Sequence, residues 1–504
     1  GEYSSDLFLY AWKKLMQNHP HDSICSCSCD EIYDEMKERF AKSVACTESL
    51  RDRALDFFAA SVDTGAVDGE RAIILFSLEP NEATVTVRAN VDFDKDDDIE
   101  AITVCDAQGN EIPATYQLIR NQFTYTLPDD RFRQPKRVTR FVVDMQVKTH
   151  GIGRQVFSVK RQAPTKTTAI RYTERTLEND ALLVHLNDNG TMDVTDKATG
   201  RVFVGQNLIE DVKDSGNLYN FHSVPGDVPV TNQNTTAAIS IHEVTPFSVT
   251  LKAELSLEID TDVTTYVTLQ SGVARVDIRT VVTNRAENHR LRALFDADIE
   301  TSTVLSEGQF DVVRRNIHPA AKWTCPHNPQ RTQAFVALES ENGSQALMIA
   351  NRGLCEYEIL RNGRNTIAVT LLRCTGEIGD WGDFPTPKGQ CKGTYTLEYS
   401  MIPYTTEARA QAYQCAYSFA APAALAIGTD IHGGSLASTS QDIAFDNAYV
   451  HMTALKKTED RDSAVIRFTA SDATSGIASV TVTRNAVDYP INANSFTADQ
   501  NGNY

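Results

Sequence analysis

The hydrophobic pattern of the chain changes its period once, near Gly69. Before Gly69, apolar side chains recur every three to four residues, which is typical of an amphipathic helix. After Gly69 they alternate with polar side chains, which is typical of strands that bury one face. We therefore predict a mainly β protein with an N-terminal helical segment.

The first sixty residues predict two helices. The first helix follows Ser4 and ends at Pro20, which cannot continue it. The second helix begins at Ser28, where Glu31 three residues later completes a capping box, and runs to about Val62. Its apolar stripe consists of Ile32, Met36, Phe40, Val44, Ala54 and Phe58. The chain must therefore turn between Pro20 and Ser28.

Strand signals fill the rest of the chain. Asp188–Gly190 is a strong hairpin signal, and Asp196–Gly200 and Gln270–Gly272 are two further turns. Two clear sets of alternating buried positions are Val85, Val87, Ala89 and Val91, and Phe141, Val143, Met145 and Val147. We expect no helix longer than about 15 residues after residue 165.

The length of 504 residues predicts two to four domains. The polar stretch Gln162–Arg171 marks one boundary, and an Ala-rich stretch after Tyr404 marks another. We expect a helical segment at 1–66, a small β-sandwich at 67–162, a large β-sandwich at 163–404 and a truncated terminal β domain at 405–504. Gly1 and the turn-like end at Tyr504 look like cuts in a longer polypeptide.

The formal net charge is −19, from 48 basic and 67 acidic residues, which argues against nucleic acid or an acidic membrane surface as partner. No apolar run reaches the roughly 18 residues of a membrane-spanning helix. Most of the ten cysteines are scattered singly, which indicates reduced thiols. We therefore predict a cytoplasmic location and leave open whether the protein forms a homo-oligomer.

The most unusual stretch is Gln17–Cys29, which holds two histidines, one aspartate and three cysteines at the predicted helix break. Read alone, His21 and Asp22 fit either a capped turn with a solvated histidine or a metal ligand beside a carboxylate. The alternating Cys25, Cys27 and Cys29 lack the two-residue spacing of zinc knuckles. They fit three small apolar residues at a helix start better than a self-contained zinc site with His21.

The residues around His21 also resemble a motif of a known family. Gln17–Cys27 closely resembles the motif that supplies the last zinc ligand in glycoside hydrolase family 38, the α-mannosidases, with Ser26 where bacterial members carry Gly. Asp214–Phe221 resembles the Gly-Asp-x-Tyr segment of that family, with Asn217 in the Asp position. Further similar stretches, in the same order as in the family, are Asn284–Phe295, Asn351–Leu354, Thr370–Arg373, Gln390–Gly393 and Ala454–Asp460.

The resemblance implies both a fold and a missing part. The family fold would make the large sandwich a galactose-mutarotase-like supersandwich. The family's catalytic domain precedes the helices and contributes a His-x-Asp zinc pair, a nucleophilic Asp and a separate acid/base. No His-x-Asp occurs in this sequence. The chain therefore resembles the C-terminal part of a zinc-dependent retaining α-mannosidase, without catalytic carboxylates of its own.

Three site residues follow from the resemblance, and Arg352, next to Gly353 at a possible loop, is a fourth candidate. His21 would be a ligand of one zinc ion, and Asp22 would contact a hydroxyl of a mannose-containing substrate. Tyr219 would reach into the pocket, although a strand aromatic in the core is an alternative. Arg352 would lie at the pocket rim, although a structural surface arginine is an alternative.

Other polar residues are expected to be structural. His289 and Arg290 would serve strand packing and ion pairing, His19 would be a helix-terminal cation, and Trp323–His327 would be a structural loop. A competing hypothesis for the whole chain is a non-catalytic β-sandwich module that binds carbohydrate or protein. The helical segment with His21 argues against it, because a binding module has no need of a zinc-ligand turn.

Overall fold

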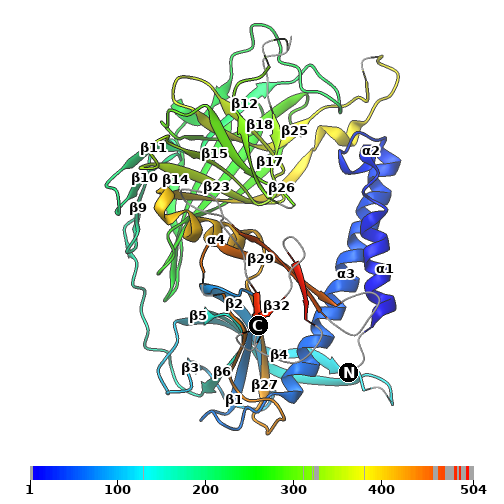
Figure 1. The fold of residues 1–504 in the computed structure, drawn as a ribbon, viewed down its shortest axis with the longest axis vertical. Coiled ribbons are helices and arrows are strands. Elements are labelled where there is room, and N and C mark those ends of the chain that lie inside the picture. The colour runs from blue at the N-terminus through cyan, green and yellow to red at the C-terminus, as the bar shows by residue number, and fades with distance from the viewer. Residues whose placement is uncertain are drawn as a thin grey trace.

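The computed structural model describes residues 4–128, 130–309, 311–320, 322, 329–379, 381–445, 447–457, 464–470, 482–484, 487–489 and 495–498. Helices open the chain, and antiparallel sheets follow them (Figure 1). This confirms a mainly β protein with an N-terminal helical segment. The expected loop Trp323–His327 and the last three residues of Ala454–Asp460 lie outside the described residues.

The N-terminal segment contains α1 (Ser5–Met16), α2 (His21–Ile24) and α3 (Asp30–Ser61). The break at Pro20 is confirmed, because Pro20 immediately precedes α2 with extended backbone angles. The single-turn helix α2 was not predicted, since four residues carry too little periodicity to reveal a helix.

The capping box predicted at Ser28 is wrong. Cys29 is the N-cap residue of α3, and it makes no side-chain cap hydrogen bond. The Ser28 hydroxyl instead donates to the carbonyl oxygen of Asp22 at 2.9 Å. The serine therefore holds the preceding turn closed, a contact that sequence spacing along α3 cannot reveal.

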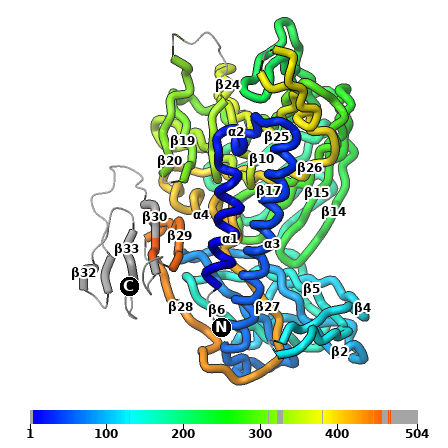
Figure 2. Tube along the Cα trace, turned by 90° about the vertical axis from the view of Figure 1, so that its right-hand side faces the viewer, coloured from blue at the N-terminus to red at the C-terminus, as the bar shows by residue number. Residues whose placement is uncertain are grey.

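Helices α1 and α3 lie side by side as an antiparallel pair (Figure 2). The Ser43 hydroxyl donates to the Ala11 carbonyl at 3.1 Å, and the Asn18 amide donates to the Met36 carbonyl at 3.0 Å. All four residues are buried, so small and polar side chains bring the two backbones close. None of the helices in the described part of the chain is both long and apolar enough to span a bilayer.

The small sandwich consists of two sheets. One has the order β27-β1-β6-β28, with β3 added to β6, and the other has the order β2-β5-β4. All eight alternating positions predicted on β2 and β5 are buried between them. The strands are β1 (Arg71–Ser77), β2 (Glu82–Asp94), β3 (Thr103–Cys105), β4 (Ala114–Thr126), β5 (Gln134–His150), β6 (Ile152–Lys160), β27 (Ala424–Asp430) and β28 (Ser440–Ile443).

Strands β27 and β28 join this sandwich from far along the chain. β27 pairs with β1 from Arg71↔Asp430 to Ser77↔Ala424, and β28 pairs with β6. Residues 424–443 therefore complete the first sandwich and do not form strands of a separate terminal domain. The boundary proposed at residue 405 otherwise stays a prediction.

The large sandwich encloses one continuous core between a nine-stranded and a six-stranded sheet, next to a five-stranded sheet. The nine-stranded sheet has the order β14 (Ala238–Val244), β15 (Ser248–Leu257), β16 (Thr261–Gln270), β17 (Val276–Asn284), β26 (Gly393–Tyr404), β23 (Ala346–Arg352), β22 (Phe335–Glu339), β19 (Thr303–Glu307) and β20 (Val312–Asn316). The six-stranded sheet has the order β13 (Val230–Thr231), β12 (Leu208–Lys213), β18 (His289–Asp296), β25 (Thr366–Cys374), β24 (Glu356–Leu360) and β21 (Gln330–Arg331). The five-stranded sheet has the order β11 (Val202–Gln206), β10 (Met192–Asp196), β9 (Leu182–Leu186), β8 (Thr176–Glu178) and β7 (Arg171–Tyr172).

The three predicted turns of this region are confirmed. Gly190 lies between β9 and β10, Gly200 between β10 and β11, and Gly272 between β16 and β17. Each has φ between +67° and +82°, a conformation that glycine adopts without steric cost. The glycine-containing turn motifs in the sequence therefore predicted the positions of these hairpins correctly.

Helix α4 (Arg409–Ala420) interrupts the region expected to contain only strands and turns. With 12 residues it is shorter than the limit of about 15 residues that we expected for helices after residue 165. Ala412, Ala416 and Phe419 are buried against β23 and β26. The helix was missed because alanines and aromatics on several sides obscure its period. Beyond it lie β29 (Val450–Lys457), β30 (Ala464–Ala470), β31 (Val482–Arg484), β32 (Val487–Tyr489) and β33 (Ser495–Ala498).

Glu307 is a buried carboxyl at the end of β19, and its Oε2 accepts a hydrogen bond from the Ala334 amide at 2.8 Å. Burial raises the pKa of Glu307 to about 7. The folded state therefore keeps a proton on Glu307 that the unfolded chain releases at a lower pH.

We predict that Glu307→Gln removes one pH-dependent contribution to stability. Between the ordinary pKa of 4.5 and the folded pKa of about 7, folded Glu307 binds more protons than unfolded Glu307, so its contribution falls as pH rises. The free energy of unfolding of wild type minus that of the variant should fall by up to about 3 kcal/mol over this range. Urea unfolding at several pH values measures it, with exposed Glu341→Gln as control. Parallel profiles for wild type and Glu307→Gln would contradict this.

Candidate functional site

The turn around α2 presents His21 and Asp22 to solvent. The Asp22 carbonyl accepts from the Cys27 amide at 3.1 Å, which helps to close the turn, and Ser26 has a left-handed φ of 59°. The His21 side chain is 92% exposed and the Asp22 side chain 56%, with His21 Nε2 and an Asp22 carboxylate oxygen 3.4 Å apart. Both groups are therefore available to a ligand outside this chain.

The three neighbouring cysteines do not converge. Cys27 is buried and lies 3.8 Å from an Asp22 carboxylate oxygen, whereas Cys25 and Cys29 are exposed. Burial raises the pKa of the Cys27 thiol, which disfavours the thiolate that a metal binds. Among the described residues, no group of three His, Cys, Asp or Glu side chains could hold a metal ion. A self-contained zinc site therefore has no structural support.

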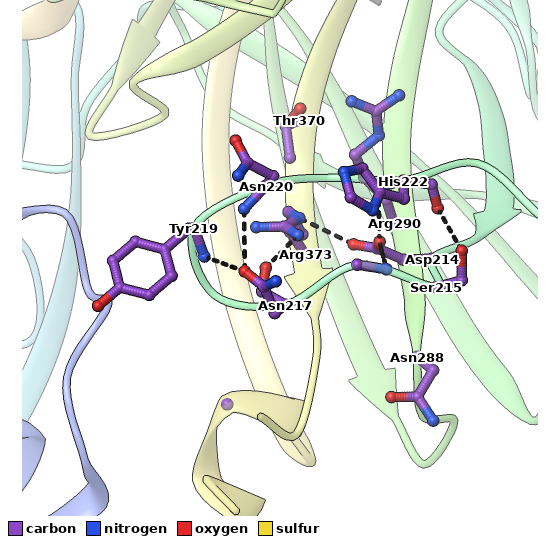
Figure 3. Close-up of polar contacts among 12 residues, drawn as sticks. Asp214, Ser215, Asn217, Tyr219, Asn220, His222, Asn288, Arg290, Thr370 and Arg373 are labelled. Carbon is purple, nitrogen blue, oxygen red and sulfur yellow. Dashed lines mark hydrogen bonds and ion pairs between the residues drawn. The ribbon is translucent and has the colours of Figure 1, made fainter. Parts of the chain in front are cut away.

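Tyr219 lies on a polar turn between β12 and β13. Asn217 is buried, and its side-chain oxygen accepts from the Tyr219 amide at 2.8 Å and from the Asn220 amide at 3.3 Å. Asn217 thus closes the turn as an aspartate would. Tyr219 is 53% exposed, and its side chain points away from Arg373, on the side where the blue N-terminal segment runs in Figure 3. The alternative of a core strand aromatic is wrong.

The Asp214–Arg373 ion pair anchors this turn to β25. Arg373 Nε donates to the fully buried Asp214 carboxylate at 2.8 Å, and its Nη2 donates to the Asn217 carbonyl. Asp214 also accepts from the amides of Gly216, at 2.8 Å, and His222, at 3.1 Å (Figure 3). Sequence reasoning included both charged residues in family-like stretches but did not pair them, because they lie 159 positions apart.

The loop 375–392, which contains the short helix η2 (Pro387–Gln390), connects the turn to the N-terminal helices. The Leu218 amide donates to the Glu377 carbonyl at 3.0 Å. The Lys388 amide donates to Asp30 at 3.2 Å, and its ammonium group pairs with Asp34. One loop therefore contacts both the Tyr219 turn and the start of α3. Because α3 begins immediately after the His21 turn, both turns lie at the same end of the molecule.

Buried charges lie beneath the Tyr219 turn on β18. Arg290 pairs with Glu358 at 3.3 Å and stacks 3.7 Å from the centre of the Phe221 ring. Burial lowers the pKa of Arg290 to about 10. His289 pairs with Asp211, whose pKa burial raises. The expectation that His289 and Arg290 serve ion pairing and packing is confirmed.

Arg352 is not brought to this end of the molecule. Its Nε donates to the Phe419 carbonyl at 2.6 Å, its Nη1 pairs with Glu398 at 3.0 Å, and its guanidinium stacks on the Phe419 ring. It lines a hollow of about 630 Å³ together with Arg275 and Thr86, between the two sandwiches. These contacts fit a residue that fixes α4 to the sheet, and a role at the pocket rim stays a prediction.

Family models match both sandwiches. The model of the glycosyl hydrolases family 38 C-terminal domain matches residues 177–377, and that of C-terminal domain 1 of the same family matches residues 82–160. A protein of Halalkalibacterium halodurans named "Putative mannosylglycerate hydrolase" is 30% identical over an alignment of 518 positions that covers 92% of this chain and 57% of that protein.

Two solved structures from Enterococcus faecalis are also similar. An α-mannosidase has a TM-score of 0.86 and 30% identity, covering 93% of this chain and 58% of that one. A family 38 protein has a TM-score of 0.82 and 29% identity, covering 93% and 60%.

Helices followed by these antiparallel sheets are the C-terminal fold of a class of glycosidases. The chain belongs to glycoside hydrolase family 38 and carries the C-terminal domains of that family. It spans 57% of the length of the curated relative that it matches.

We predict that Asp214→Ala lowers the free energy of unfolding by about 3–5 kcal/mol, because it leaves Arg373 without its buried partner. Amide hydrogen exchange should also increase in residues 215–222, which lose two hydrogen bonds to the carboxylate. As a control, Asp68→Ala removes an exposed carboxylate 2.9 Å from Lys160 and should cost much less, because exposed ion pairs contribute little to stability. Equal losses in the two variants would show that the Asp214 pair does not anchor the turn.

Proposed function

We propose that this chain is the C-terminal portion of a zinc-dependent retaining α-mannosidase that hydrolyses terminal α-mannosyl residues of oligosaccharides or glycosides. In this proposal its large sandwich is a galactose-mutarotase-type supersandwich. The nucleophile and the acid/base would lie in a catalytic domain outside this chain. Family membership and the names of the related proteins support the proposal.

The observation that carries the proposal is the exposure of His21 and Asp22. His21 lies on a one-turn helix beside a carboxylate, and its side chain is 92% exposed. It can therefore bind a ligand that another domain presents. The loop 375–392 binds both the start of α3 and the Tyr219 turn. His21, Asp22 and Tyr219 can therefore contribute to one pocket.

The chain can supply one part of a zinc site. An imidazole and an adjacent carboxylate are suitable donors, but protein zinc sites need at least three protein ligands. His21 would supply one ligand, and the others would come from the catalytic domain. Bound there, zinc would hold the vicinal hydroxyls of the mannose ring and help to distort it.

The other residues of this chain would bind and orient the sugar. Asp22 would accept a hydrogen bond from a mannose hydroxyl, and Tyr219 would contribute its exposed ring and hydroxyl to the pocket wall. In a retaining mechanism, one carboxylate forms a glycosyl-enzyme and a second transfers protons, and both would lie on the catalytic domain. Positioning would thus be the contribution of this chain.

The helices also expose a surface suited to contact with another domain. Large apolar residues of α1 and α3 are 36–53% exposed among the described residues, which is unusual unless a partner surface packs on them. The exposed side chains are Leu7, Phe8, Leu9, Tyr10, Trp12, Met16, Ile32, Tyr33, Phe40, Val44, Phe57 and Phe58. We assign this surface of the helices to contact with the catalytic domain. A stand-alone binding module would not be expected to leave it open.

We predict that the purified chain alone does not hydrolyse an aryl α-mannoside. Removing catalytic groups that act as a unit removes nearly all the rate enhancement. Release of the aryl group should equal that in buffer, with or without added zinc. Turnover that His21→Ala abolishes would mean that the site is built differently from our proposal.

In the polypeptide that includes the catalytic domain, we predict that His21→Ala loses zinc and activity. Loss of groups that only support a metal ligand costs about 10- to 100-fold, so loss of a ligand should lower kcat/KM by more than about 100-fold. Metal analysis and kinetics measure both effects. The control is His19→Ala, since the His19 ring contacts the Leu15 carbonyl at 3.0 Å and is exposed. Stoichiometric zinc and normal kcat in His21→Ala would refute the assignment.

A further inference from the structure

Two cysteines meet at the base of the loop 375–392. Cys374 is the last residue of β25 and is fully buried, and Cys391 follows η2 and is half-buried. The Thr375 amide donates to the Gly389 carbonyl at 3.1 Å, which draws the two ends of the loop together. Cysteines 17 positions apart in sequence are thereby adjacent in space.

The contacts of the two cysteines place them side by side. Cys391 Sγ lies 3.7 Å from the carbonyl oxygen of Arg373, the residue immediately before Cys374. Interaction with Cys374 lowers the pKa of Cys391, and interaction with Cys391 raises the pKa of Cys374. The half-buried thiol is thus the one whose thiolate is favoured.

Asn284 holds this pair in place. Its amide nitrogen lies 3.5 Å from Cys374 Sγ and donates to the Cys391 carbonyl at 3.0 Å. Its side-chain oxygen lies 3.1 Å from His289 Nε2, and the other ring nitrogen of His289 contacts Asp211. Contacts with Asp211 and Asn284 therefore fix the His289 ring, whose electrostatic interaction with Cys391 lowers the pKa of that thiol.

We propose that Cys374 and Cys391 form a thiol–disulfide exchange site, which low-molecular-weight disulfides oxidise to an intramolecular disulfide. A more exposed thiol beside a buried resolving thiol is the arrangement that such exchange requires. The exchange reaction uses none of the residues that we assign to the proposed glycosidase activity.

The chemistry proceeds in two displacements. The Cys391 thiolate attacks one sulfur of the small disulfide, whose S–S bond breaks and releases one thiolate. Cys374 then attacks Cys391 Sγ, its proton passes to the second departing thiolate, and the protein disulfide forms. The two protein sulfurs lose two electrons, and one small disulfide is reduced to one thiolate and one thiol.

The disulfide would tie β25 to the start of β26 beneath the loop. That loop binds Leu218 in the Tyr219 turn through Glu377, and it binds Asp30 and Asp34 of α3 through Lys388. Closing the loop covalently restricts the unfolded chain, so oxidation should raise the melting temperature and protect the loop from proteolysis.

The test uses the purified, fully reduced chain incubated with glutathione disulfide. After alkylation of the remaining thiols and tryptic digestion without reductant, cleavage after Arg373, Lys388 and Lys392 places the cysteines on separate peptides. We expect a disulfide-linked pair of Cys374–Lys388 and Gly389–Lys392, lighter by two hydrogen atoms than the sum of the free peptides. Recovery of both peptides as alkylated thiols, or as separate glutathione adducts, would overturn the proposal.

Two variants test the order of attack and the identity of the paired cysteines. Cys374→Ser should retain one glutathionyl group on Cys391, because the resolving thiol is gone, and its absence in folded protein would contradict the proposed order of attack. Cys105→Ser removes another buried thiol, on β3, and should leave the linked peptide unchanged. If Cys374→Ser does not fold, the wild-type digest alone decides the proposal.

Discussion

The chain passes from the six-stranded sheet of the large sandwich to the nine-stranded sheet between β25 and β26, and the loop 375–392 makes this crossing. At that point it also accepts a hydrogen bond from Leu218 and reaches Asp30 and Asp34. One connection between the two faces of the core therefore sets the positions of the Tyr219 turn and the helical segment. The pocket that we propose around His21 and Tyr219 depends on the contacts of this loop.

Beneath the loop, charged side chains are buried at positions that apolar side chains usually occupy. Arg292 pairs with Glu210, and with Glu358 at 2.9 Å, beside the Arg290–Glu358 pair. Buried ion pairs contribute little net stability, because desolvation offsets their attraction, but removing one partner is costly. Such a network favours one arrangement of β12, β18 and β24. It thereby gives the turn after β12 a fixed support.

Local sequence patterns predicted the features that depend on neighbouring residues. The two helices, the eight alternating positions of β2 and β5, and three glycine turns were correct. The family motifs also singled out the stretch of Tyr219 and the turn of His21. The capping role of Ser28 was wrong and α4 was missed, because in both cases contacts outside the local segment determine the structure.

The sequence by itself determined the hydrophobic period of each segment and the helix break at Pro20. It also determined that His21 and Asp22 lie at that break. Side-chain spacing and backbone restriction act over a few residues, so a sequence shows them directly. Only the tertiary structure decided that β27 pairs with β1 and that Asp214 meets Arg373. Those choices depend on which distant surfaces bury one another and which charges can be paired inside the core, and a local pattern contains neither.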